Sequence, residues 1–126
     1  MILIDEVTEI PQLLWTEHSS LEFSTANVMS IQEASQLIWL IKAETVLAVA
    51  GLIYGSFSSP PWLWFLTTQE LKALHVRQLQ PLVKKLAPGT LTAVKNDFTM
   101  GHKFAKLFEF APTELVEQDY RIYRKI

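Results

Sequence analysis

One apolar run constrains the fold of this chain more than any other stretch. The run is Val46-Leu47-Ala48-Val49-Ala50-Gly51-Leu52-Ile53, and nearly every position in it is apolar. A strand with one solvated face would alternate between apolar and polar residues, so both faces of this strand are expected to be covered. The run therefore predicts a central strand in a sheet that has helices on both faces.

Further stretches rich in β-branched and aromatic residues and bounded by turn residues are also expected to be strands. The six predicted strands are Ile2–Ile4, Leu37–Ala43, Val46–Gly55, Trp62–Leu66, Thr90–Val94 and Tyr120–Ile126. The last strand alternates, so one of its faces is expected to be solvated. Trp62 and Trp64 should share one sheet face and Leu63 and Phe65 the other, with at least one tryptophan in the core.

Four helices are expected around the sheet, from capping residues and apolar spacing. They run from Thr8 to Trp15 or Glu17, over Ile31–Ser35 after a Ser30/Glu33 capping box, over Leu71–Leu86 after a Thr67/Glu70 capping box, and from about Thr99 to Phe108. The third should carry an apolar stripe of Leu71, Leu74, Gln78, Leu82 and Leu86, and the fourth one of Phe104, Leu107 and Phe108. Pro81 should break the third helix near Gln80. His18–Asn27 is expected to be a loop.

This element order predicts an α/β fold with a mixed sheet, because antiparallel strands come first and a strand–helix–strand–helix–strand tail follows. At 126 residues the chain is expected to be a single domain, residues 1–126. A net charge of −2 leaves no basic footprint for nucleic acid. Lys42 and Glu44 interrupt the apolar region, so no membrane span is expected. The N-terminus lacks the features of a signal peptide, and the mature chain is expected to start at Met1.

Few residues suggest catalysis. The chain has no cysteine, which excludes a thiolate nucleophile and a cysteine-bound zinc ion. His18, His75 and His102 have no metal-ligand spacing, so no metal site is expected. Glu44 and Glu70 could each serve as a general base, but a tight turn and a helix cap explain them more simply. Basic residues on the two late helices, namely Lys72, Arg77, Lys84, Lys85, Lys103 and Lys106, form either a solvated face or a contact for an acidic partner.

The chain resembles the Gcn5-related N-acetyltransferase (GNAT) family in the order of its later elements. The resemblance lies in Trp62–Leu66 and the helix after it, Leu91–Asn96, the Lys103–Phe110 helix and the final strand. It covers most of the chain in element order and little of it in motif. It implies a GNAT-like mixed sheet of about six strands.

Scattered shorter motifs resemble the small GNAT-like proteins of short-tailed bacteriophages, a group that includes an internal virion protein. These motifs are Ala34-Ser35-Gln36-Leu37, Ala48-Val49-Ala50-Gly51, Trp64-Phe65-Leu66-Thr67-Thr68, Val94-Lys95-Asn96 and Lys103-Phe104-Ala105-Lys106-Leu107-Phe108. This resemblance implies a role in a virion or in particle assembly. It also implies a location in the virion or the host cytoplasm.

The GNAT cofactor site is only partly matched. In the family, a glycine-containing loop after the fourth strand holds the pyrophosphate of acetyl-CoA through backbone N–H groups. The matching segment, Leu66-Thr67-Thr68-Gln69-Glu70-Leu71, has no glycine, and Glu70 is expected in the first helical turn, where it would repel phosphate. If a cofactor binds, Leu66, Thr67, Thr68 and Gln69 are the residues expected to hold it.

The catalytic residues of the family are also incompletely matched. Aligning Glu109-Phe110 with the family's Gly-Phe pair places Ala105 where a tyrosine often protonates the leaving thiolate. Asn96 matches a frequent GNAT asparagine, although it could equally cap the next helix. Glu44 and Asn96 thus remain the only catalytic candidates, and both are weak.

Two functions follow as hypotheses. The first is a non-catalytic virion or assembly protein that contacts other virion or host proteins and could form a homo-oligomer, with no cofactor expected. The second is an acetyl-CoA-dependent N-acetyltransferase with an altered cofactor geometry. A cleft that separates Trp62–Leu66 from Thr90–Val94 would favour the second hypothesis, and a sheet closed along these strands would exclude it.

Overall fold

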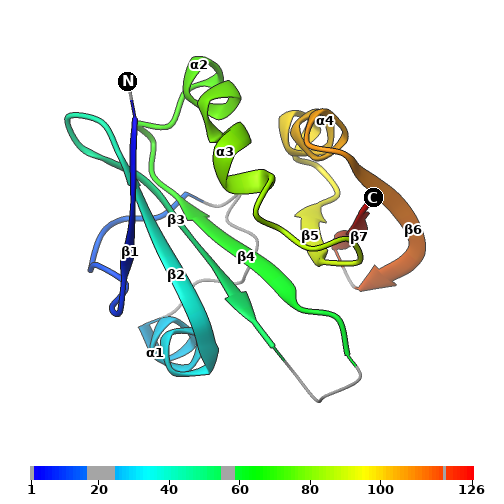
Figure 1. Cartoon of the computed structure of the whole chain (residues 1–126), viewed down its shortest axis with the longest axis horizontal. Coiled ribbons are helices and arrows are strands. Elements are labelled where there is room, and N and C mark those ends of the chain that lie inside the picture. The colour runs from blue at the N-terminus through cyan, green and yellow to red at the C-terminus, as the bar shows by residue number, and fades with distance from the viewer. Residues whose placement is uncertain (1, 17–24, 55–58, 118) are drawn as a thin grey trace.

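The computed structural model describes residues 2–16, 25–54, 59–117 and 119–126. It contains a seven-stranded sheet in the order β1-β2-β3-β4-β5-β7-β6 (Figure 1). Only β4 and β5 are parallel neighbours, and the other pairs are antiparallel. The strands are β1 Leu3–Val7, β2 Ser35–Lys42, β3 Val46–Ile53, β4 Trp62–Thr67, β5 Leu91–Lys95, β6 Phe110–Glu117 and β7 Tyr120–Lys125. The predicted α/β mixed sheet is confirmed, with one strand more than expected.

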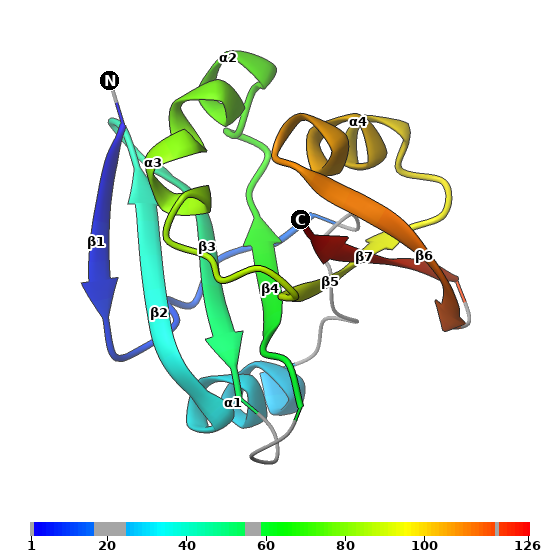
Figure 2. The ribbon, with the colours of Figure 1, turned by 45° about the vertical axis from the view of Figure 1, so that its right-hand side comes forward.

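Helices cover both faces of the sheet, as predicted. They are α1 Thr25–Ala34, α2 Ala73–Val76, the 3₁₀ turn η1 Arg77–Leu79, α3 Gln80–Val83 and α4 Thr99–Leu107. On one face, Ile31 of α1 packs in a cluster with Val49 and Trp64. The other core cluster contains Leu82 of α3 and Ala105 of α4. Figure 2 shows α1 well separated from the other helices. No helix in the described segments is long and apolar enough to cross a membrane.

The apolar run forms the middle of the antiparallel half of the sheet. β3 pairs with β2 on one side and with β4 on the other, and Val49 is completely buried. Gly51 lies against the ring of Trp64, so that a Cβ atom would lie 2.6 Å from its Cε2 atom. The Trp64 indole N–H donates to Ser35 Oγ at 2.8 Å. Trp64 is therefore the predicted core tryptophan, and glycine lets β3 approach it closely.

The first predicted helix, from Thr8 to Trp15 or Glu17, is wrong over residues 8–16. Glu17 lies outside the described residues. Residues 8–16 contain no helix. Ile10 is buried instead in the cluster beside α1, and its N–H donates to Gln32 Oε1 at 2.8 Å. Thr16 donates its N–H to the carbonyl oxygen of Thr67 at 2.7 Å. Tertiary contacts thus hold this segment without a local helix.

The second helix is longer than predicted. It begins at Thr25, so Ser30 lies inside it and does not cap it. The predicted loop is therefore wrong at its last three residues, 25–27, while 18–24 lie outside the described residues. Ser35 already belongs to β2, and its hydroxyl donates to the Ile31 carbonyl oxygen at 2.6 Å.

The third helix is not continuous, and its predicted capping box is wrong. Thr67 is the last residue of β4, and the helical segment begins only at Ala73. Lys72 precedes it and donates its N–H to His75 Nδ1 at 3.0 Å. The interruption expected from Pro81 is present as the 3₁₀ turn immediately before α3. Pro81 itself lies near the start of α3, where a missing N–H costs little.

The end of the chain differs from the prediction in two respects. β6 was not predicted, because Pro112 interrupts the strand pattern in its sequence. In the structure, the pairing of β6 with β7 is irregular between Pro112 and Val116. In β7, the adjacent residues Ile122 and Tyr123 are both buried. Because neighbouring side chains of a strand point to opposite faces, the expectation of one solvated face is wrong.

Candidate ligand-binding site

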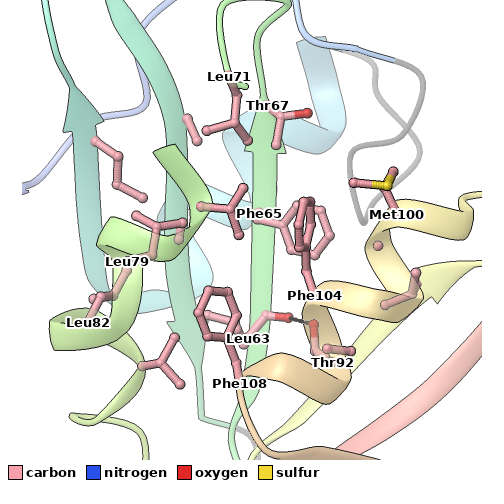
Figure 3. A pocket seen from close by; sticks show the side chains of 18 of the residues that line it. Leu63, Phe65, Thr67, Leu71, Leu79, Leu82, Thr92, Met100, Phe104 and Phe108 are labelled. Carbon is pink, nitrogen blue, oxygen red and sulfur yellow. Dashed lines mark hydrogen bonds between the residues drawn. The ribbon is translucent and has the colours of Figure 1, made fainter. Parts of the chain in front are cut away.

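The sheet opens between β4 and β5. The two strands pair only at Trp62↔Leu91 and Leu63↔Thr92, although β4 continues to Thr67 and β5 to Lys95. A continuous parallel pair would carry evenly spaced hydrogen bonds along its length. Beyond the second pair the strands separate, and α4 lies beside the opening (Figure 3).

A cavity of about 460 Å³ occupies this opening and extends beneath α2 and α3. Its volume lies within the range of small-molecule sites. The residues that line it are Thr16, Ile41, Ala48, Ala50, Leu63, Phe65, Thr67, Thr68, Gln69, Leu71, Lys72, Ala73, Val76, Leu79, Leu82, Val83, Leu86, Thr92, Val94, Phe98, Met100, Gly101, Phe104, Ala105, Phe108 and Phe110. Most of these side chains are aliphatic or aromatic, so the cavity favours an apolar ligand.

The threonine hydroxyls of the cavity wall are already bonded within the protein. Thr67 Oγ1 lies 2.6 Å from Thr16 Oγ1, and Thr92 Oγ1 donates to the Leu63 carbonyl oxygen at 3.0 Å. Thr68 Oγ1 lies 2.9 Å from the Val46 carbonyl oxygen and 3.1 Å from that of Leu47. The hydroxyl protons of Thr68 and Thr92 are therefore already donated to protein carbonyl oxygens, which leaves few donors on the cavity wall for a ligand.

The cavity has one polar, open end and one buried, apolar end. Figure 3 shows Thr67 and Leu71 at the first end and Leu82 and Phe108 towards the second. At the open end, Gln69 and Lys72 are exposed. The Lys72 ammonium group donates to the Gln69 carbonyl oxygen at 3.0 Å and retains further donors.

Three of the four residues predicted to hold a cofactor lie at this open end. Thr67, Thr68 and Gln69 line the cavity. Leu66, only 1% exposed, packs in the cluster on the opposite face of the sheet. Glu70 is exposed and precedes the helical segment, so the prediction that its carboxylate lies in the first helical turn is wrong.

The two weak catalytic candidates do not line the cavity. Glu44 is exposed in the turn between β2 and β3, and Asn96 is exposed just beyond β5. Phe98 precedes α4 as its N-cap residue, and no side chain caps that helix. The interpretation of Asn96 as a helix cap is therefore wrong.

Sequence reasoning missed Lys72 as a site residue, together with the apolar walls that α3 and α4 provide. From the sequence, Lys72 was grouped with the basic residues of the late helices. The sequence does not show which side chains lie beside Lys72 in space. The spacing of Phe104 and Phe108 indicated a buried helix face but not that the face borders a cavity. Ala105, aligned with the family tyrosine, also lines the cavity.

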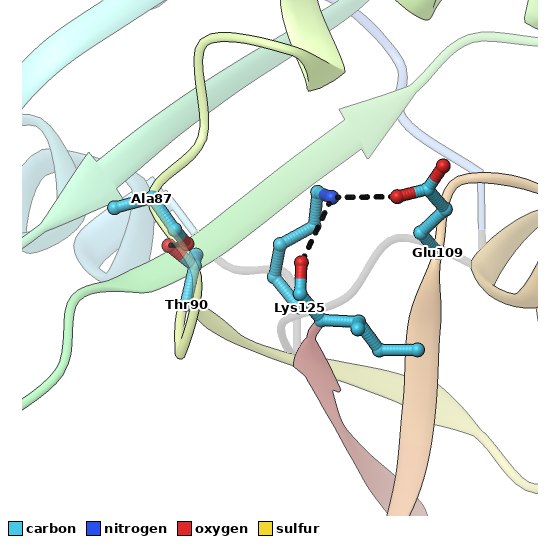
Figure 4. A network of polar contacts seen from close by, with 5 residues as sticks. Ala87, Thr90, Glu109 and Lys125 are labelled. Atoms are coloured by element: carbon cyan, nitrogen blue, oxygen red, sulfur yellow. Dashed lines mark hydrogen bonds and ion pairs between the residues drawn. The ribbon is translucent and has the colours of Figure 1, made fainter.

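Glu109 has a backbone conformation that is uncommon for a residue with a Cβ atom. Its φ angle is 65°, in the left-handed region that glycine favours after a helix. Its carboxylate lies 3.5 Å from the Lys125 ammonium group (Figure 4). Figure 4 also shows Thr90, whose hydroxyl donates to the Ala87 carbonyl oxygen at 2.7 Å where the chain enters β5.

A histidine–tyrosine pair, His102 of α4 and Tyr123 of β7, lies outside the cavity lining. Tyr123 Oη lies 2.6 Å from His102 Nδ1, while His102 Nε2 lies 3.0 Å from the Lys95 carbonyl oxygen. A carbonyl oxygen can only accept, so Nε2 carries a proton and, in the neutral ring, the Tyr123 hydroxyl donates to Nδ1. Burial raises the pKa of Tyr123 above 10.0, and the charge of Arg121 partly opposes this effect.

The described residues contain no group of three or more side chains arranged to hold a metal ion. Comparison of the chain with known protein families finds no matching family model, and comparison with curated proteins finds no similar protein.

Proposed function

We propose that this chain is a non-catalytic binding protein on a GNAT-like scaffold, acting through contacts with other proteins of a virion or assembly. One observation carries the proposal. Among the described residues that line the cavity, Lys72 is the only titratable side chain. Transfer of an acyl group to an amine requires that the amine lose a proton, and the lining contains no carboxylate or imidazole to accept it.

The outer edge of the sheet offers a surface for protein contacts. β6 pairs only with β7 and forms one edge of the sheet. Its residues Leu115 and Val116 are both 54% exposed. Exposed apolar side chains on both faces of an open edge strand favour pairing of that strand with another chain. We expect the partner to be a second copy or another virion or host protein.

Sedimentation velocity of the purified chain tests this proposal. We expect a concentration-dependent dimer or a complex with particle proteins. Leu115→Glu with Val116→Glu should weaken either one, because the carboxylates would be desolvated at the contact. Leu3→Glu on the opposite edge is the matched control, since Leu3 is similarly exposed at 55%. A chain that stays monomeric and does not bind particles would contradict the proposal.

A second candidate function is acetyl-CoA-dependent N-acetyl transfer, with a water molecule relaying the proton. The separation of β4 from β5 favours it, because a sheet closed along these strands would leave no room for the pantetheine arm. The glycine-free turn and the four-residue α2 oppose it, since neither supplies the usual phosphate cradle.

Thermal unfolding with and without millimolar acetyl-CoA or CoA tests the second candidate. A ligand at 100 times its dissociation constant stabilises the folded state by about 2.7 kcal/mol. That would raise the midpoint of a domain of this size by several degrees. An unchanged midpoint with both compounds would exclude this candidate.

A further inference from the structure

We propose that the cavity binds the acyl chain of a fatty acid, with the carboxylate beside Lys72. This inference goes beyond the proposed function, because contacts between proteins at the sheet edge do not require an interior ligand site. It rests on the size of the cavity, the distribution of its polar groups and the structure of its roof.

The size of the cavity fits a single chain of medium length. In the liquid a water molecule occupies about 30 Å³, so a volume of about 460 Å³ holds about fifteen groups of that size. A methylene group is similar in size to a water molecule. The cavity therefore accommodates a chain of about ten to fourteen carbons.

The cavity walls select an amphiphile over a polar ligand. The hydroxyls of Thr67, Thr68 and Thr92 are bonded to other protein groups. A sugar or nucleotide buried there would lose more hydrogen bonds to water than the few polar groups of this lining could replace. Each buried methylene of an acyl chain instead contributes about 0.8 kcal/mol of transfer free energy.

The open end provides the charge that a fatty acid requires. Lys72 is the only charged residue among the described residues of the lining, and its side chain is exposed at that end. Met100, 41% exposed, lies across the cavity from Leu71 at the same end (Figure 3). A carboxylate beside Lys72 stays hydrated while the chain extends towards Phe108.

The interrupted helical segment explains why the space is not filled by the protein. α2, η1 and α3 are three short consecutive pieces that alternate between α and 3₁₀ geometry, and Leu74 is 65% exposed although its spacing placed it on the apolar stripe. Its side chain therefore does not fill the interior. Leu79 and Leu82 form part of the roof, and the volume below them is left to a ligand.

Isothermal titration of the full chain with dodecanoate and with dodecanol, both below their micelle-forming concentrations, tests this inference. We expect both to bind. Lys72→Glu should weaken dodecanoate binding at least tenfold and change dodecanol binding less than twofold. Lys84→Glu is the matched control, because Lys84 is exposed and does not line the cavity. It should change neither affinity.

A cavity-filling variant, Ala50→Leu, tests the location. It should abolish binding of both compounds while circular dichroism shows a folded chain. Unchanged binding by folded Ala50→Leu would place the ligand elsewhere and overturn the proposal. If this variant does not fold, the charge variants decide, because both lysines are exposed.

Absence of dodecanoate binding to the wild-type chain would also overturn the proposal. So would equal loss of both ligands in Lys72→Glu. Binding of CoA without binding of dodecanoate would overturn it in favour of the enzyme candidate. None of these results bears on self-association, which sedimentation measures separately.

Discussion

Glu109 adopts a conformation that glycine adopts at lower cost than any residue with a Cβ atom. Its φ angle of 65° lies at the end of α4, where the chain turns into β6. The Lys125 partner compensates little, because the Glu109 side chain is 74% exposed and its ion pair is screened by solvent. Local strain therefore outweighs the ion pair at this residue.

Glu109→Gly is expected to raise the free energy of unfolding by about 0.5 kcal/mol. The relief of left-handed strain, about 1 kcal/mol, exceeds the extra entropy of glycine in the unfolded chain. Urea denaturation measures the change. Glu109→Ala removes the carboxylate but keeps the strain, so it serves as the control. A glycine variant less stable than the alanine variant would show that backbone strain is smaller than the entropy cost of glycine at this position.

Because of Tyr123, the free energy of unfolding is expected to depend on pH in the alkaline range. Burial raises its pKa in the folded state above the ordinary value of 10.0. Its contribution is therefore complete below pH 10.0 and is lost as the pH rises through the higher folded-state pKa, because the unfolded chain releases the proton first.

Urea midpoints of wild type and Tyr123→Phe between pH 8 and 11 test this expectation. At pH 8 the variant should be about 1 kcal/mol less stable, because it lacks the hydrogen bond to His102. The difference should shrink above pH 10 as the wild-type phenol ionises. A constant difference across this range would show that Tyr123 does not titrate on unfolding.

At the scale of elements, the broken segment α2–η1–α3 separates residues that its sequence pattern grouped together. Leu74 and Leu82 belong to one predicted stripe, yet they are 65% and 6% exposed. A continuous helix is required for a stripe to keep one orientation. In α4, which is continuous, the predicted apolar face is wrong for another reason: Leu107 is exposed and the C-cap residue Phe108 is buried, because successive residues of a helix point in directions about 100° apart.

Alanine substitution measures this separation. Leu74→Ala should change the free energy of unfolding by less than about 0.5 kcal/mol, as at most exposed sites. Leu82→Ala should cost about 2 to 3 kcal/mol, near the low end for core leucines, because a cavity already borders this side chain. Equal costs in chemical denaturation would indicate that the segment forms one continuous helix in solution.

The whole molecule consists of two parts of one sheet joined by a short seam. β1 to β4 form the larger part and β5 to β7 the smaller, and the strands at the seam share only two residue pairs. The backbone hydrogen bond from Leu91 to the Pro61 carbonyl oxygen, 2.9 Å, lies at the same seam. Because strand pairing at the seam is so short, we expect the two parts to open separately, although side chains of both belong to one core cluster.

Native-state hydrogen exchange is expected to show two cooperative units. Amides of β5, α4, β6 and β7 should open at a lower free energy than those of β2 to β4, which contain the most buried strand. The control is the β2–β3 pair, whose amides should open together. A single common opening energy for all strands would contradict this division.

Much of the fold could be predicted from the sequence because it depends on local patterns. Strands β2, β3, β4, β5 and β7 and helix α4 begin and end within a few residues of their predictions. The beginning of α1 and the strand β6 could not be predicted, since capping-box spacing occurs by chance and Pro112 disrupts the strand pattern. The extended segment around Ile10 depends on contacts with α1 that are distant in sequence.

The candidate site could be predicted only at its open end, where Thr67 ends β4 and Thr68 and Gln69 follow it. Which residues lie at a strand end and which side chains are apolar are local properties, and they follow directly from the order of residues along the chain. The separation of β4 from β5, the cavity and the position of Lys72 were decided only by tertiary structure. They depend on how strands and helices that are far apart in the chain pack against one another. A cavity remains only where the packed side chains do not fill the space between these elements.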